Sequence, residues 1–142
     1  MSTIYYLIAA ILTSQPSVGY KGFDAAVVAK FTNATSCNNA ASSVESLIVD
    51  TSPTSTIVNS DTNAFCVIAP SVSSGVSYTL VANYWAGRNN TARDVKQISI
   101  PGFQTNAGCV NAGEAIENNI ESHFATAGVP NVFVNYRCIQ TQ

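Results

Sequence analysis

The sequence predicts an α+β fold of two tandem modules, each with the order strand, strand, helix, strand (ββαβ) and a three-stranded, mainly antiparallel sheet. The main observation is an internal repeat, in which the segment FTNATSCNNAASSVESLI, beginning at Phe31, aligns with FQTNAGCVNAGEAIENNI, beginning at Phe103. The same shift of 72 positions carries Cys66 onto Cys138. A repeat of this kind indicates one structural unit written twice.

The chain length and a stretch of turn-forming residues set the boundaries of the two units. We expect a first module over residues 1–69, a linker over 70–77 that is rich in Ser with Pro and Gly, and a second module over 78–142. Each half has the size at which a hydrophobic core alone gives only a few kcal/mol and covalent staples are common.

The composition is rich in hydrophobic and uncharged polar residues and poor in charged ones. Hydrophobic residues make up 46% of the chain and charged residues 10%, against about 25% in a typical soluble domain. An uncharged polar surface suits permanent packing against neighbours. The net charge is −2 and the basic residues are scattered, so we expect no nucleic-acid partner.

The strands are predicted from apolar runs between turn signals. The run at 4–12 is too short to span a membrane, and its repeat counterpart at 78–85 is internal, so we interpret both as buried strands rather than targeting or membrane segments. We therefore expect no membrane partner. The full set of predicted strands is 3–13, 23–31, 63–68, 78–85, 95–100 and 131–140.

One helix is predicted in each module, starting after an N-cap at Asn33 in the first copy and at Thr105 in the second. Apolar and small residues recur at helical spacing in both copies. These faces consist of Cys37, Ala41, Val44 and Ile48 in the first helix and Cys109, Gly113, Ile116 and Ile120 in the second.

A single helix covers only one face of a three-stranded sheet, and the other face also needs cover. The nearest cover is the other module, so we expect a pseudo-twofold pair of modules that meet through sheet faces or sheet edges. The alternative is that neighbouring chains of an assembly cover these faces.

The duplication predicts the disulfides Cys37 to Cys66 and Cys109 to Cys138, because each module has one cysteine near its helix start and one in its last strand. Reduced buried thiols are the alternative. A zinc site is a weaker alternative, because the chain has no CxxC pair and a single histidine. Disulfides persist in oxidising surroundings.

No catalytic constellation is apparent, and we expect a protein that is not an enzyme and uses no cofactor, metal or small-molecule substrate. His123 has no nucleophile or orienting acid indicated near it. Glu114, Glu117 and Glu121 recur at helical spacing, which is typical of a solvated face. For partner contact the candidates are Tyr84, Trp85 and Arg88 in a hairpin. Trp85 is equally compatible with a core position.

In a pattern of short motifs, the sequence resembles a group of short bacteriophage proteins. The pattern is a Tyr-Tyr-Leu-Ile strand at Tyr5 and its counterpart at Tyr78, followed by Phe before a helix cap, a cysteine in the helix and a second cysteine in the last strand. In this sequence the remaining positions are Phe31, Asn33, Cys37, Cys66, Phe103, Thr105, Cys109 and Cys138. The resemblance implies a phage origin and a doubled module, and it transfers no active site.

These observations together favour a structural component of a virus particle, such as a capsid decoration, cement or tail-associated protein. Its partners would be other virion proteins or copies of itself, and its location the virion, reached from the host cytoplasm without a cleaved signal peptide. The alternative is a small secreted or periplasmic binding module that uses the Tyr84 and Trp85 hairpin.

Overall fold

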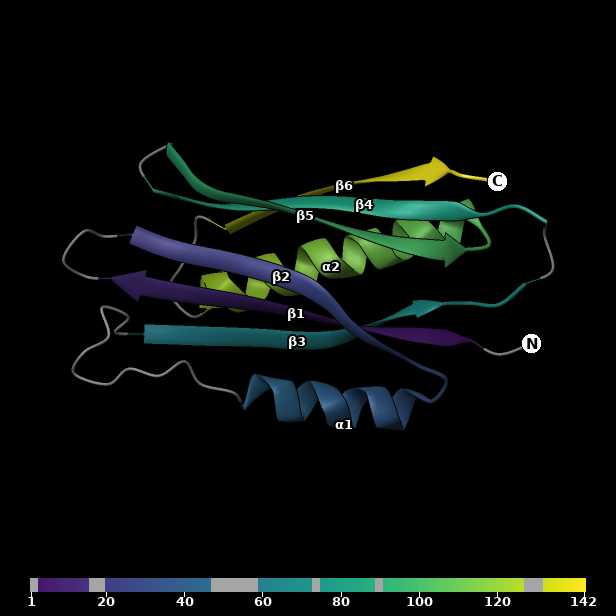
Figure 1. Cartoon of the computed structure of the whole chain (residues 1–142), viewed down its shortest axis with the longest axis horizontal. Coiled ribbons are helices and arrows are strands. Elements are labelled where there is room, and N and C mark those ends of the chain that lie inside the picture. Colours follow the sequence, from purple (N-terminus) through teal and green to yellow (C-terminus); the bar gives the residue numbers. More distant parts are fainter. Residues whose placement is uncertain (1–2, 16–19, 47–58, 73–74, 89–90, 127–131) are drawn as a thin grey trace.

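A computed structural model describes residues 3–15, 20–46, 59–72, 75–88, 91–126 and 132–142. Each half of the chain folds as strand, strand, helix, strand, so the predicted doubled ββαβ layout is confirmed (Figure 1). The elements are β1 (Ile4–Gln15), β2 (Tyr20–Phe31), α1 (Ala34–Glu45), β3 (Asn59–Ala69), β4 (Tyr78–Arg88), β5 (Thr91–Phe103), α2 (Asn106–Thr126) and β6 (Val132–Gln140).

The strands form two antiparallel three-stranded sheets, which we call the first sheet (β2-β1-β3) and the second sheet (β5-β4-β6). Their registers repeat as the sequence does. Ala9 of β1 pairs with Ala26 of β2, and their repeat counterparts, Ala82 of β4 and Ile98 of β5, are likewise paired. Five of the six strands extend beyond the predicted ranges, in several cases because polar residues near the hairpin ends continue the ladders beyond the apolar runs. The exception is β6, which begins one residue later than predicted.

Both predicted helix caps are confirmed. The Asn33 side-chain oxygen accepts a hydrogen bond from the backbone N–H of Ser36 at 3.0 Å, and Thr105 Oγ1 accepts one from Gly108 at 2.9 Å. Such caps satisfy backbone donors that the first helical turn leaves free. The helices differ in length, since α1 ends at Glu45 and α2 continues to Thr126. The predicted face residue Ile48 lies outside the described residues.

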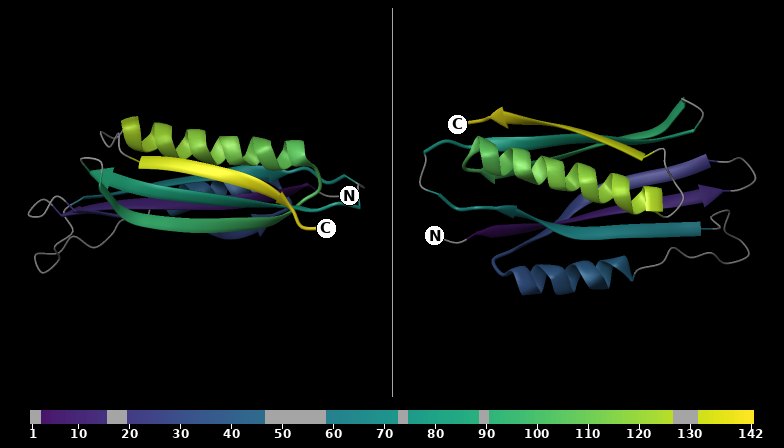
Figure 2. Two further views of the ribbon diagram at one scale, coloured as in Figure 1. Left: turned by 90° about the horizontal axis from the view of Figure 1, so that it is seen from above. Right: turned by 180° about the vertical axis from the view of Figure 1, so that it is seen from behind.

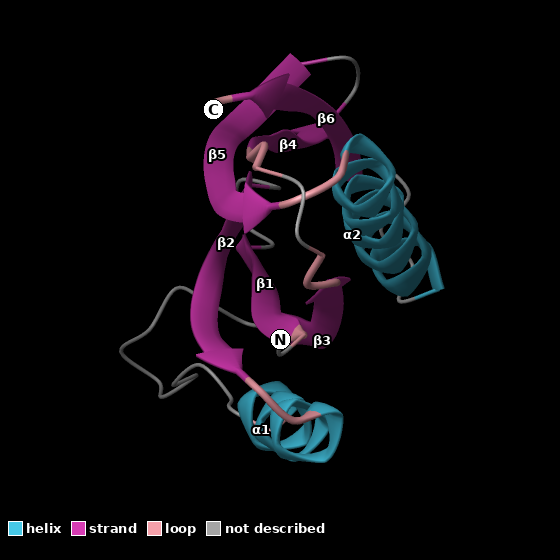
Figure 3. Cartoon of the chain, turned by 90° about the vertical axis from the view of Figure 1, so that its right-hand side faces the viewer, coloured by secondary structure: helices cyan, strands magenta, loops and turns pink. Residues whose placement is uncertain are grey.

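The two sheets share one core with α2. In the end-on view, β2 and β5 lie next to each other at one side, α2 lies at the other side, and α1 lies beneath the first sheet (Figure 3). Helix α2 packs against β6 and β4 of its own sheet and also against β3 of the first sheet, as the rear view also shows (Figure 2). Among the described residues, α1 has no comparable packing against the second sheet; it packs on β1, β2 and β3.

Alternation along β1 distributes its residues between two cores. Leu7 faces α1 in a small cluster with Cys37 and Ala41. Tyr6 and Ile8 point the other way, into the large core that contains residues of both sheets and of α2. The expectation that the modules cover one another is confirmed for the first sheet. The edge contact joins the repeat counterparts β2 and β5, whereas the two helices are not equivalent in the assembly.

Three hydrogen bonds between the modules fix this arrangement. The Tyr6 hydroxyl donates to the carbonyl oxygen of Pro101 at 2.9 Å, and the Asn63 amide donates to the carbonyl of Asn119 in α2 at 3.2 Å. The third runs from the Tyr84 hydroxyl to Ala25 in β2. Polar groups taken out of water are expensive to leave unpaired. These bonds therefore favour one relative placement of the sheets over others with the same apolar burial.

The helices approach their sheets with different side-chain volumes at equivalent positions. In the second module Gly113 of α2 lies under the ring of Tyr136, and a Cβ on Gly113 would stand 2.3 Å from Cδ2 of that ring. The repeat counterparts are Ala41 and Ala64, both buried. The space between the helix and the last strand is thus filled in different ways. In the second module the large ring of Tyr136 lies beside a glycine, and in the first module two alanines take these positions.

Replacing Gly113 with alanine is expected to lower the free energy of unfolding by about 1 to 3 kcal/mol, because overpacking strains a filled core. Denaturant unfolding measures this loss. In a Tyr136→Ala background the same change should cost nothing and can stabilise by up to about 1 kcal/mol, the gain in helix propensity. An equal loss in both backgrounds would contradict the proposed contact.

Candidate functional site

The four cysteines form the two predicted disulfides. Cys37 is bonded to Cys66 with an S–S distance of 2.02 Å, and Cys109 to Cys138 with 2.09 Å. No described cysteine is free, so the alternatives of reduced thiols and of a zinc site are wrong for this structure. Each bond joins the first turns of a helix to the last strand of the same module.

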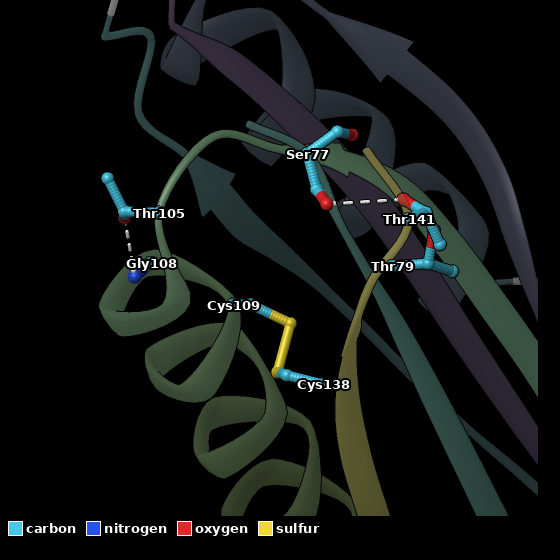
Figure 4. Close-up of a disulfide and its surroundings, with 7 residues drawn as sticks. All are labelled: Ser77, Thr79, Thr105, Gly108, Cys109, Cys138 and Thr141. Atoms are coloured by element: carbon cyan, nitrogen blue, oxygen red, sulfur yellow. Dashed lines mark hydrogen bonds between the residues drawn. A yellow bond between two sulfur atoms is a disulfide. The ribbon is translucent and has the colours of Figure 1, made fainter. Parts of the chain in front are cut away.

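The second disulfide lies where several chain segments meet (Figure 4). Cys109 is fully buried in the first turn of α2, just after the Thr105 cap. Beyond Cys138, the backbone N–H of Thr141 donates to the carbonyl of Ser77 at 2.8 Å, which fastens the end of the chain beside the start of β4. The disulfide therefore holds the helix start to the last strand, and the backbone hydrogen bond holds the segment preceding β4 beside them.

The structure corrects the expectation that Tyr84 contacts a partner. Its side chain is fully buried, and its hydroxyl donates to the carbonyl oxygen of Ala25 at 3.0 Å. Alternation along β4 places it on the inner face with Leu80 and Ala82. The backbone of Trp85 pairs with Phe133 in β6, and Arg88 ends β4. The side chains of Trp85 and Arg88 lie outside the described residues.

Burial changes the acid–base behaviour of Tyr84. Removal from water, with the negative charge of Asp24 acting in the same direction, raises the pKa of its phenol well above the ordinary value of 10.0. The neutral form is thus the one that the folded chain accommodates. Tyr84 thus connects the two modules through its hydrogen bond to Ala25 and does not lie on the surface.

The histidine and the three glutamates singled out in the sequence all lie on α2. The ring of His123 packs edge-on against that of Phe124, with the centroids 5.1 Å apart. Partial burial, and secondarily the charge of Glu117, raises the pKa of the Glu121 carboxyl, while a backbone hydrogen bond from Val134 opposes the rise. No group of three potential metal ligands occurs among the described residues.

A surface that the sequence did not single out is the face of the second sheet that points away from α2, which we call the outer face. Its most prominent members are Phe133 and Ile139 of β6, which are 41% and 48% exposed. The register places on this face Thr79, Val81, Asn83, Gln97, Ser99, Phe133, Asn135, Arg137 and Ile139. Its counterpart on the first sheet, with Tyr6 and Ile8, is buried in the shared core.

The fold and its two disulfides define the chain as a double ββαβ protein, and no described residue covers the outer face of its second sheet. No protein-family model matches the chain, and no curated protein or solved structure matches it significantly. Neither described helix combines the length and the apolar character needed to cross a bilayer.

Removal of one staple, by Cys109→Ser with Cys138→Ser, is expected to lower the free energy of unfolding by about 3 to 4 kcal/mol, because the bond closes a loop of 29 residues. Denaturant unfolding measures the loss, with Ser122→Ala on the exposed side of α2 as control. A non-reducing peptide map should show only bonds within modules, and a bond between Cys37 and Cys109 would contradict the pairing.

The stability of the fold is expected to fall as the pH rises above 10. The unfolded chain releases the Tyr84 proton near pH 10, whereas the folded chain retains it because its pKa is raised. This contribution is complete below pH 10 and is lost on going above it. Tyr84→Phe should cost about 1 to 3 kcal/mol at pH 7 and should flatten the alkaline decline.

Unfolding at several pH values between 8 and 11.5 measures this difference, with Tyr78→Phe on the same strand as the matched control. Equal alkaline slopes for the wild-type chain and the Tyr84→Phe variant would show that Tyr84 does not carry the effect.

Proposed function

We propose that this chain is a non-enzymatic structural component of a bacteriophage particle, such as a capsid decoration, cement or tail-associated protein. In this role it packs permanently against other virion proteins or against copies of itself. The observation that carries the proposal is the uncovered outer face. In one module this sheet face is buried by the other module, and in the second module no described part of the chain covers it.

The chemistry of the outer face suits contact with a protein. Among its described side chains Arg137 is the charged one, and the others include hydroxyl and amide groups and the exposed Phe133 and Ile139. Cores of protein interfaces are depleted in charge and enriched in aromatic residues and arginine. The Gln97 amide donates to Asn83 at 2.8 Å, so part of the polar surface is already held in place. Such an ordered surface loses little side-chain entropy when a partner binds.

Rigidity supports the same role. Two disulfides, three inter-module hydrogen bonds and a helix shared by both sheets hold the outer face in one orientation. A particle released from its host meets oxidising surroundings, in which such disulfides persist. The rival proposal of a secreted binding module has lost one of its contacts, since Tyr84 is buried.

Mass spectrometry of purified particles tests the proposal directly, and absence of the chain from them would contradict it. Ile139→Asp should reduce the amount of chain per particle at least tenfold, because a carboxylate buried at an interface without a partner is strongly unfavourable. Ile68→Asp is the matched control, since Ile68 is 51% exposed and lies on the first sheet. Equal incorporation of both variants would show that the outer face is not the surface that contacts the particle.

A further inference from the structure

The described part of the first sheet carries a hollow. It has a volume of about 220 Å³ and lies on the α1 side of the first sheet, beside Val44 near the end of that helix. It is lined by Ala9, Ala10, Ile11, Asp24, Ala25, Ala26, Val44 and Thr62. We call this the Ala26 hollow. A cavity of about 150 Å³ with apolar walls is enough to hold a benzene ring.

The repeat shows what fills this place in the second module. The register matches Ala26 with Ile98 and Ile11 with Tyr84, and the repeat matches Val44 with Ile116. All three of these larger counterparts are buried. The hollow is thus the result of smaller side chains on the same backbone framework.

The helices add to the difference. In the second module α2 extends beyond Ile116 and buries Ile120 and Phe124 completely in the same core cluster. Helix α1 ends at Glu45. At a shift of 72 positions Ile120 corresponds to Ile48 and Phe124 to Ser52, so Phe124 has no aromatic counterpart in the first half of the sequence. Both counterparts lie outside the described residues.

We propose that the Ala26 hollow receives an aromatic side chain presented by a helix of a partner protein, in the way that α2 presents Phe124 within the second module. The inference rests on the proposed function, because the partner would be a neighbour in the particle. Among the described lining residues Asp24 is the only charged one, and its exposed carboxylate disfavours a fatty acid or another anionic amphiphile. A neutral or basic helix with an exposed aromatic residue fits this chemistry.

The hollow and the outer face lie on opposite sides of the molecule. The hollow is on the side of the first sheet that faces α1, whereas the outer face is on the side of the second sheet that points away from the shared core. The end-on view shows α1 and the second sheet at opposite ends of the molecule (Figure 3). Occupation of both would let one chain bridge two neighbours.

A peptide of the chain's own sequence Asn111–Thr126 serves as the probe, because it contains Ile116, Ile120 and Phe124 on one helical face. Methyl NMR of the full chain should show saturable shifts at Ala9, Ala26 and Val44. Affinity should fall at least tenfold with a Phe124→Ala peptide, since the anchoring ring is lost. It should fall equally with an Ala26→Ile chain, in which the hollow carries the residue of the second module.

The matched control is Val28→Ile, which enlarges an exposed residue of β2 that does not line the hollow and should leave binding unchanged. Absence of saturable shifts, or equal binding of the two peptides, would overturn the proposal. A toluene titration is the second arm. Saturation by toluene without binding of the peptide would assign the hollow to small apolar molecules and would likewise overturn it.

A negative result for the hollow can be told apart from a negative result for the proposed function. Peptide binding is measured on the isolated chain, whereas incorporation into particles is measured with the Ile139→Asp and Ile68→Asp variants. A chain that enters particles but binds no peptide would refute only the role of the hollow. Thermal unfolding of the Ala26→Ile chain confirms that the variant is folded.

Discussion

Burial of α2 against both sheets is the constraint on which the rest of the structure depends. Helix α2 contributes Ile116, Ile120 and Phe124, all fully buried, to a core that also contains Tyr6 and Ile8 of the first sheet. Apolar burial of this extent dominates the stability of small domains. Because one helix serves two sheets, neither the position of the first module nor the exposure of the outer face can be explained from a single module.

The two copies have diverged in volume while retaining their backbone plan. Gly113 with Tyr136 replaces Ala41 with Ala64, and Ile98 replaces Ala26, at positions related by the repeat. Packed cores tolerate exchanges that preserve total volume, and they leave a cavity where volume is lost without compensation. In the first exchange the missing side chain of Gly113 makes room for the ring of Tyr136, whereas the smaller side chains of the first sheet leave the Ala26 hollow.

Much of the module could be predicted from the sequence, because its determinants are local or repeated. The caps at Asn33 and Thr105 depend on neighbouring residues, and the pairing of the cysteines follows from their equal placement in two copies. Packing between modules could not be predicted in detail, since β1 and β4 read as apolar on both faces. For this reason the pattern does not distinguish the buried Tyr84 from a residue that contacts a partner, and it does not indicate the outer face, whose exposure depends on where α2 lies.

Helix α2 also bears on how such a molecule could arise. A solitary module would leave the ring of Tyr6 and the side chain of Ile8 in water, together with the neighbouring apolar positions of its sheet. A single-copy ancestor would therefore have needed a second polypeptide to shield them, and its folding would have varied with protein concentration. Joining two copies in one gene removes that dependence, and it frees the copies to diverge, as the greater length of α2 than of α1 illustrates.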